Sequence, residues 1–189
     1  MGRWQPDARM RLQEAALALY GERGYDETTV AQIAERAGLT KRTFFRYFAD
    51  KREVLFWGAQ FLEQRMVAAI DAAPASVSTL ALIGAALDAA AVQFEEVREF
   101  AGQRYRIIAS SPELQERELI KAASLAAAMA SAMRKRGLGE TAADLAAHTA
   151  TTVMHIAYAQ WVEDAEQRPF EQIAREALAQ LRELTAEAE

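Results

Sequence analysis

The hydrophobic pattern of this chain fits helices along its whole length and fits strands in no segment. Alanine is abundant, β-branched residues are sparse, and no stretch alternates polar and apolar residues with a period of two. The 189 residues are 51% hydrophobic and 26% charged, as in an ordinary soluble globular protein. We therefore expect an all-α protein with about nine helices.

Glycine, proline and capping residues predict where these helices begin and end. The expected helices cover residues 7–23, 29–38, 40–48, 50–73, 78–97, 99–109, 113–136, 141–164 and 170–187. The first three would form a small head, and the long fourth helix would connect this head to a larger helical body. This organisation predicts two domains, residues 1–52 and residues 53–189.

The cysteine content and the hydropathy exclude several classes of protein. Without cysteine, the chain can form neither a disulfide scaffold nor a thiolate metal site. Residues 1–7 lack the apolar run of a secretory signal. The longest uncharged stretch, residues 145–162, contains His148, His155 and several threonines, so it is too polar for a membrane span. We expect a cytoplasmic protein with no membrane partner, in which this stretch is a buried helix.

The distribution of charge indicates a local contact with a polyanion. The net charge of −5 by itself argues against a nucleic-acid-binding protein. However, residues 1–53 contain 10 Lys/Arg and 8 Asp/Glu, whereas residues 54–189 contain 12 and 19. Residues 39–52 alone carry five basic side chains and one acidic side chain, Asp50. Positive charge focused in one short stretch of an acidic protein is typical of a nucleic-acid contact.

Residues 29–48 have the pattern of a helix-turn-helix motif. Two short predicted helices are joined by a turn that contains a glycine, and in such a motif the second helix lies in the major groove of DNA. On a helical wheel, Phe44 and Phe48 share one face, and Arg42 and Arg46 lie almost opposite. Because two arginines four residues apart repel each other, an exposed pair of this kind favours an anionic partner.

Residues 9–55 resemble the DNA-binding head of the tetracycline-repressor (TetR/AcrR) family of bacterial transcriptional regulators. The stretches that carry the resemblance, with ungapped spacing, are Ala15–Tyr20, Gly24-Tyr25, Thr28–Val30, Ile33-Ala34, Ala37–Thr40, Thr43–Phe48 and Lys51. The resemblance implies a three-helix DNA-binding domain, residues 1–52, and a ligand-binding and dimerisation domain, residues 53–189. It also implies a homodimer on a palindromic operator of double-stranded DNA, most often a repressor that a small-molecule ligand releases.

The resemblance further implies which residues contact DNA. These residues are Thr29, Thr40, Lys41, Arg42, Thr43, Phe45, Arg46, Tyr47 and Lys51. Thr29 would give its hydroxyl and backbone N–H to a phosphate, and residues 40–43 would read base edges. Residues 46–47 would extend the contact to sugar and phosphate, and Lys51 would close on the DNA backbone. The family usually has tyrosine at the position of Phe45, so this ring is left with thymine-methyl or sugar contacts.

The body offers candidate ligand-binding residues, each with a second interpretation. The candidates are Phe61, Phe94, Arg104, His148, Thr152 and His155. The two histidines and Thr152 form a stripe that could face a ligand cavity, although histidines satisfied by core neighbours are commoner. Arg104 or Arg106 could pair with an anionic group of a largely apolar effector, or with solvent-exposed Asp or Glu side chains of the protein. Aromatic side chains at helical spacing are also typical of a core.

The last predicted helix carries a continuous apolar face. Its members are Phe170, Ile173, Ala174, Ala177, Leu178 and Leu181. Such a face must cover either the core of its own chain or a partner. A two-fold homodimer is favoured, because it would present two heads to a palindromic site.

Two other classes of protein compete with this interpretation. An enzyme is disfavoured, because the chain has no Glu-x-x-His pair, no Gly-rich phosphate loop after a strand, and no recognisable catalytic set. His148 and His155 are seven residues apart, whereas metal ligands on a helix usually lie four apart. We therefore expect no catalytic residue, cofactor or metal. A helical ligand-binding or scaffold protein that does not touch DNA stays the alternative.

Overall fold

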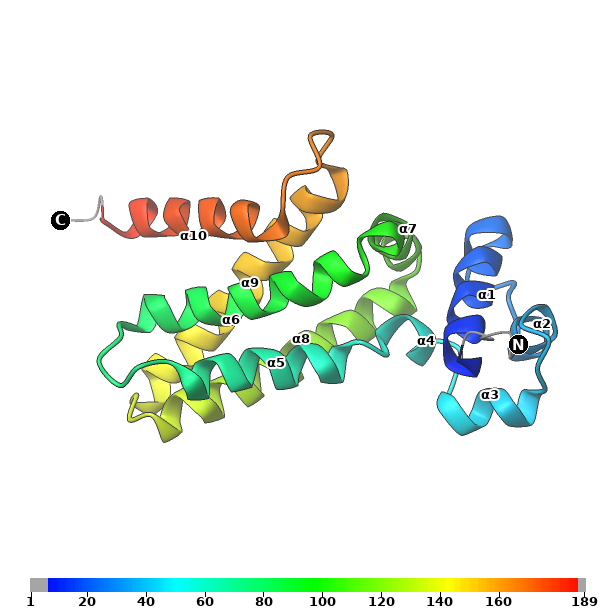
Figure 1. The fold of residues 1–189 in the computed structure, drawn as a ribbon, viewed down its shortest axis with the longest axis horizontal. Coiled ribbons are helices and arrows are strands. Elements are labelled where there is room, and N and C mark those ends of the chain that lie inside the picture. The colour runs from blue at the N-terminus through cyan, green and yellow to red at the C-terminus, as the bar shows by residue number, and fades with distance from the viewer. Residues whose placement is uncertain (1–6, 187–189) are drawn as a thin grey trace, which may run out of the picture. The chain divides into compact units, whose positions relative to one another are not determined.

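The computed structural model describes residues 7–186, and this part of the chain is all-helical, which confirms the predicted fold class (Figure 1). Its helices are α1 (Ala8–Arg23), α2 (Val30–Arg36), α3 (Lys41–Tyr47), α4 (Glu53–Phe56), α5 (Ala59–Ala72), α6 (Thr79–Glu96), α7 (Arg98–Ala109), α8 (Pro112–Lys135), α9 (Glu140–Glu163) and α10 (Phe170–Ala186). The described part does not include residues 1–6, which were considered above for a secretory signal. It also does not include Glu187, the predicted end of the last helix. No helix within residues 7–186 is long and apolar enough to cross a membrane.

The helices pack into two compact units. Of the described residues, the first unit contains 7–58 together with Gln103–Glu118. The second contains Ala59–Gly102 together with 119–186. The helices α7 and α8 therefore each contribute residues to both units.

The bounds of these units differ from the predicted domains 1–52 and 53–189. Ile107, Ile108 and Leu114 are buried in the hydrophobic core of the first unit, although they lie far from the head in sequence. A local sequence pattern cannot indicate that a later segment completes an N-terminal core. The division of the chain into a DNA-binding domain and a ligand-binding and dimerisation domain stays a prediction.

The helix predicted over residues 50–73 is interrupted. Its residues form the short helix α4 and the longer helix α5, which are separated at Trp57 and Gly58. Apart from proline, glycine is the residue least favourable to a helix interior. The first compact unit also ends at Gly58, so the interruption coincides with the boundary between the units.

The short helices of the first unit begin and end at residues that favour such ends. Thr29 and Gln32 form the capping box predicted at the start of α2, with each side chain bonded to the backbone N–H of the other residue. Thr40 caps α3 by accepting a hydrogen bond from the backbone N–H of Thr43. Gly38 follows α2 with a φ of 64°, in the left-handed region that glycine enters without a steric penalty.

The helix α10 covers the core of its own unit. Phe170, Ile173 and Ala174 are buried in that core, and Leu178 and Leu181 are half-buried against it. Between the two alternatives that the sequence left open, the apolar face of α10 therefore serves the core of its own chain.

Replacement of Phe44 is expected to destabilise the first unit strongly. Phe44 is completely buried between α1, α2 and α3, so Phe44→Ala should lower the free energy of unfolding by about 3–5 kcal/mol. The neighbouring Phe45 is 57% exposed and provides a matched control, since Phe45→Ala should change stability by less than about 1 kcal/mol. Urea unfolding followed by circular dichroism measures both values. Equal effects of the two substitutions would contradict the observed orientation of α3.

Candidate nucleic-acid interface

The predicted recognition helix α3 buries one face and exposes the other. The rings of Phe44 and Phe48 lie 5.5 Å apart in the core of the first unit. The side chains of Lys41, Arg42 and Arg46 are exposed. The orientation predicted from the helical wheel is therefore confirmed, and one short helix presents three basic side chains to solvent.

Two of these basic side chains are free to bind an external anion. Lys41 and Arg42 have no ion-pair or hydrogen-bond partner among the residues that the structure describes. By contrast, Arg36 on α2 pairs with Glu22 at 2.5 Å, and Arg52 pairs with Asp50 at 2.7 Å. The positive surface is therefore narrower than the basic stretch of the sequence, and it is concentrated on α3.

Two arginines hold the tyrosine at the end of α3. Arg46 donates a hydrogen bond of 3.1 Å to the Tyr47 hydroxyl, and its guanidinium lies 4.9 Å from the centroid of the Tyr47 ring. Arg9 of α1 lies 5.5 Å from the same ring and 5.0 Å from the ring of Trp57. The sequence did not indicate a role for Arg9, because its contacts depend on how α1 crosses the end of α3.

The threonines predicted to contact DNA take part in the capping of α2 and α3. The backbone N–H and the hydroxyl of Thr29 both point to the side-chain oxygen of Gln32, at 2.8 and 3.0 Å. A phosphate oxygen would replace this amide oxygen in the predicted DNA contact. The hydroxyls of Thr40 and Thr43 lie 3.0 Å apart at the start of α3. The ring of Phe45 is largely exposed, as a sugar or thymine-methyl contact requires.

Lys51 lies apart from this basic surface. Its ammonium donates hydrogen bonds to the backbone carbonyls of Tyr25, Asp26 and Thr28 at 2.8, 3.3 and 3.0 Å. It also lies 4.1 Å from the centroid of the Tyr25 ring. The backbone carbonyl of Lys51 accepts a bond of 2.6 Å from the Tyr20 hydroxyl. The predicted phosphate contact of Lys51 is therefore not supported, because the ammonium is already saturated inside the protein.

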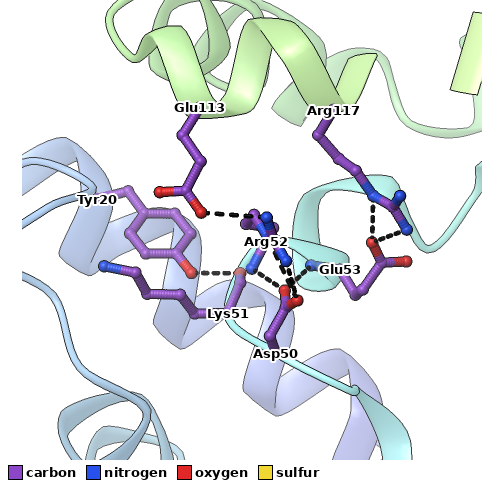
Figure 2. Close-up of polar contacts among 7 residues, drawn as sticks. All are labelled: Tyr20, Asp50, Lys51, Arg52, Glu53, Glu113 and Arg117. Atoms are coloured by element: carbon purple, nitrogen blue, oxygen red, sulfur yellow. Dashed lines mark hydrogen bonds and ion pairs between the residues drawn. The ribbon is translucent and has the colours of Figure 1, made fainter. Parts of the chain in front are cut away.

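Ion pairs connect the start of α4 with the first turns of α8, as Figure 2 shows. Arg52 pairs with Asp50 at 2.7 Å and with Glu113 at 3.3 Å. Glu53 pairs with Arg117 at 2.6 Å. These contacts, like the buried Ile107 and Leu114, belong to the first compact unit and explain why residues 103–118 pack with the head.

The surroundings of Asp50 favour its charged form. Burial tends to raise its pKa, but hydrogen bonds from the Arg52 side chain and from the backbone N–H groups of Glu53 and Arg52 hold the pKa below its ordinary value of 3.8. Burial raises the pKa of the Tyr20 phenol, so this hydroxyl stays a donor toward the carbonyl of Lys51. At neutral pH the network therefore contains a carboxylate, a guanidinium and a neutral phenol.

The structure does not gather the six predicted ligand-binding residues into one site. Arg104 belongs to the first unit, where it donates to the carbonyl of Leu55 at 2.8 Å, pairs with Glu118 at 3.4 Å and stacks on Phe56. Because this guanidinium has internal partners, the predicted pairing of Arg104 with a ligand anion is not supported. Arg106 is exposed on the same segment.

The other predicted ligand residues lie in the second unit, in three different settings. Phe94 contacts Tyr158, Trp161 and Phe170 in an aromatic cluster. Phe61 is exposed near the start of α5. His148, Thr152 and His155 lie on the exposed side of α9, so the expectation that residues 145–162 form a buried helix holds only for the opposite side of this helix. Within the described part of the chain, no three His, Asp or Glu side chains gather as a metal site would require.

The comparisons agree with this geometry. Residues 12–56 match the model for bacterial regulatory proteins of the tetR family. Over 81 residues the chain is 38% identical to the HTH-type transcriptional regulator TcmR of Streptomyces glaucescens, which covers 43% of this chain and 36% of that protein. The match therefore spans only about a third of TcmR.

Solved structures extend the likeness to the whole fold. A TetR-family transcriptional regulator from Syntrophomonas wolfei aligns over 95% of both chains with a TM-score of 0.67 and 15% identity. The regulator FadR from Bacillus subtilis, solved with stearoyl-CoA, aligns over 90% of this chain and 95% of its own with a TM-score of 0.60 and 16% identity.

The fold, the exposed basic helix and the matched domain define a helix-turn-helix transcriptional regulator. The predicted resemblance to the tetR family is confirmed, since residues 12–56 match the model of that family and the described part of the chain has the all-helical fold of a solved tetR-family regulator.

Proposed function

We propose that this chain is a homodimeric repressor that binds a palindromic operator and is released by a small, largely apolar effector. The observation that carries the proposal is the surface of α3, where Lys41, Arg42 and Arg46 are exposed while Arg36 and Arg52 are paired internally. A short basic helix in the second position of a helix-turn-helix is suited to the major groove of DNA.

The exposed face of α9 supports a homodimer. Leu145 and Ile156 are 65% and 47% exposed, and His148, Thr152 and His155 lie exposed between them. No charged residue occurs from position 145 to position 162. Cores of protein interfaces are depleted in charge, and a self-complementary patch on one helix suits a two-fold axis. We infer that a second copy of this chain covers the exposed face of α9.

The aromatic cluster of the second unit supports an effector with a polar acceptor. Phe94, Tyr158 and Phe170 surround Trp161, whose ring centroid lies 5.5 Å from that of Tyr158. The buried indole N–H of Trp161 has no acceptor among the described residues. Since an unsatisfied buried donor costs free energy, an apolar effector with a carbonyl or carboxylate at this position would be favoured.

The proposal is tested by selecting duplexes from a randomised library with the purified protein and titrating them by fluorescence anisotropy. A regulator of this kind should enrich a palindrome and bind it with a steep dependence on salt. A helical ligand-binding or scaffold protein without DNA binding would enrich no sequence. Stearoyl-CoA is the first effector probe, and release of the selected duplex together with quenching of Trp161 fluorescence would support the effector site.

A further inference from the structure

We propose that Lys51 is a positioning residue for DNA binding, which holds the loop before Thr29 and does not contact a phosphate. The inference rests on the proposed DNA-binding function. It assigns to Lys51 a role through backbone carbonyls, in place of the direct contact with the DNA backbone that the family resemblance implied.

All three N–H donors of the Lys51 ammonium are engaged in hydrogen bonds within the protein. A lysine ammonium carries three N–H donors and no acceptor. Three backbone carbonyls, those of Tyr25, Asp26 and Thr28, lie within 2.8–3.3 Å of Nζ. The Tyr25 ring stabilises the same charge at 4.1 Å, although a cation–π contact uses no N–H. A phosphate could bind this ammonium only if at least one of these bonds were lost.

The loop that Lys51 holds is also fixed by its own side chains. Thr28 is buried, and its hydroxyl donates to the carbonyl of Gly24 at 2.8 Å. The Tyr25 side chain is buried against Tyr20, with the two ring centroids 5.4 Å apart. The Tyr20 hydroxyl in turn holds the backbone of Lys51. The loop and the segment after α3 are therefore bound to each other in both directions.

These contacts between Lys51 and the loop before Thr29, which we call the Lys51 clamp, set the distance between two DNA-contacting segments. Thr29, a predicted phosphate contact, directly follows the carbonyl of Thr28, which accepts from Lys51. On the other side, Lys51 lies four residues after Tyr47, the last residue of α3. Loss of the ammonium would let the start of α2 move relative to α3, and would weaken contacts that Lys51 does not itself make.

A matched pair of lysine variants tests the proposal on a duplex that the wild-type protein selects from a randomised library. Loss of a phosphate contact lowers the slope of log K against log salt by about one, and this is the result expected for Lys41→Met, whose ammonium is exposed. Lys51→Met should weaken binding about tenfold for every duplex, with an unchanged slope. Lys51→Arg should recover most of the loss, since a guanidinium can donate to the same carbonyls.

Two further results decide whether Lys51 acts through Thr29. In a Thr29→Ala background, Lys51→Met should have little additional effect on affinity, and additive losses would overturn the proposal. A slope lowered by about one in Lys51→Met would overturn it as well.

Chemical modification keeps the test independent of how the variants fold. Reductive methylation of the free wild-type protein should modify Lys41 quickly and Lys51 slowly. Equal rates without DNA, followed by protection of Lys51 when the duplex is added, would show a phosphate contact and refute the proposal. If the wild-type protein selects no duplex, the proposed function fails, while the methylation rates still report on the Lys51 clamp.

Discussion

Replacement of Arg42 and Arg46 together by alanine is expected to weaken specific operator binding strongly and to leave the fold intact. Both side chains are exposed, and the core contacts of α3 come from Phe44 and Phe48 on the opposite face. Alanine is the best helix former, and the repulsion between the two arginines disappears in the variant. The variant also loses the exposed contacts of Arg46 with Tyr47, so the free energy of unfolding should stay within about 1 kcal/mol of the wild-type value.

The loss of DNA affinity in this double variant should be large. A base-reading arginine contributes about 1–3 kcal/mol, so removal of both corresponds to roughly 30-fold to 10⁴-fold weaker binding. If one of the two contacts a phosphate, its single variant should weaken all sequences equally and lower the salt slope by about one. Fluorescence anisotropy of the single and double variants, at several salt concentrations, separates these contributions.

Arg36 provides the matched control for this experiment. It is an exposed arginine of the same helix-turn-helix, but it forms an ion pair with Glu22 and belongs to α2. Arg36→Ala should leave the fold intact, since an exposed ion pair contributes little to stability. Operator affinity should then stay within about twofold of the wild-type value. A folded Arg42→Ala/Arg46→Ala protein that binds as tightly as Arg36→Ala would show that α3 does not face DNA.

The second large effect is expected from charges on the exposed face of α9. Leu145→Glu together with Ile156→Glu should leave the protomer folded, because both side chains are exposed in the single chain. In a dimer, the carboxylates would be desolvated near a two-fold axis, at a cost of about 3–5 kcal/mol. Sedimentation at micromolar concentration should then detect monomers. A monomer holds one half-site only, so operator affinity should fall by roughly 10³-fold.

The control for the dimer experiment makes the same chemical change on another helix. Val92 of α6 is 55% exposed, and Val92→Glu should leave both the oligomeric state and the operator affinity unchanged. Leu178→Asp is not diagnostic, because Leu178 packs against the core of its own unit and its loss should unfold the protomer. A Leu145→Glu/Ile156→Glu protein that sediments as a dimer would exclude the α9 face as the interface.

The sequence by itself determined the helical class, the helix-turn-helix and the orientation of its second helix. The sequence signals for these features come from residues that are at most four positions apart. These signals include the capping box of Thr29 and Gln32 and the glycine after α2. They also include the helical periodicity that places Phe44 on the buried face of α3 and Arg42 and Arg46 on the exposed face. Such short-range interactions leave a periodic or positional signal that can be recognised before any packing is known.

The tertiary structure alone decided which charged side chains of the basic stretch are free. Lys51 finds its carbonyl partners 23 to 26 residues away, and Arg117 reaches Glu53 across 64 residues. Arg104, which by its sequence could have served a ligand, instead binds the carbonyl of Leu55. Partners this distant leave no periodic trace in the sequence. Whether a charge meets DNA, a ligand or its own backbone therefore follows only from how the helices pack.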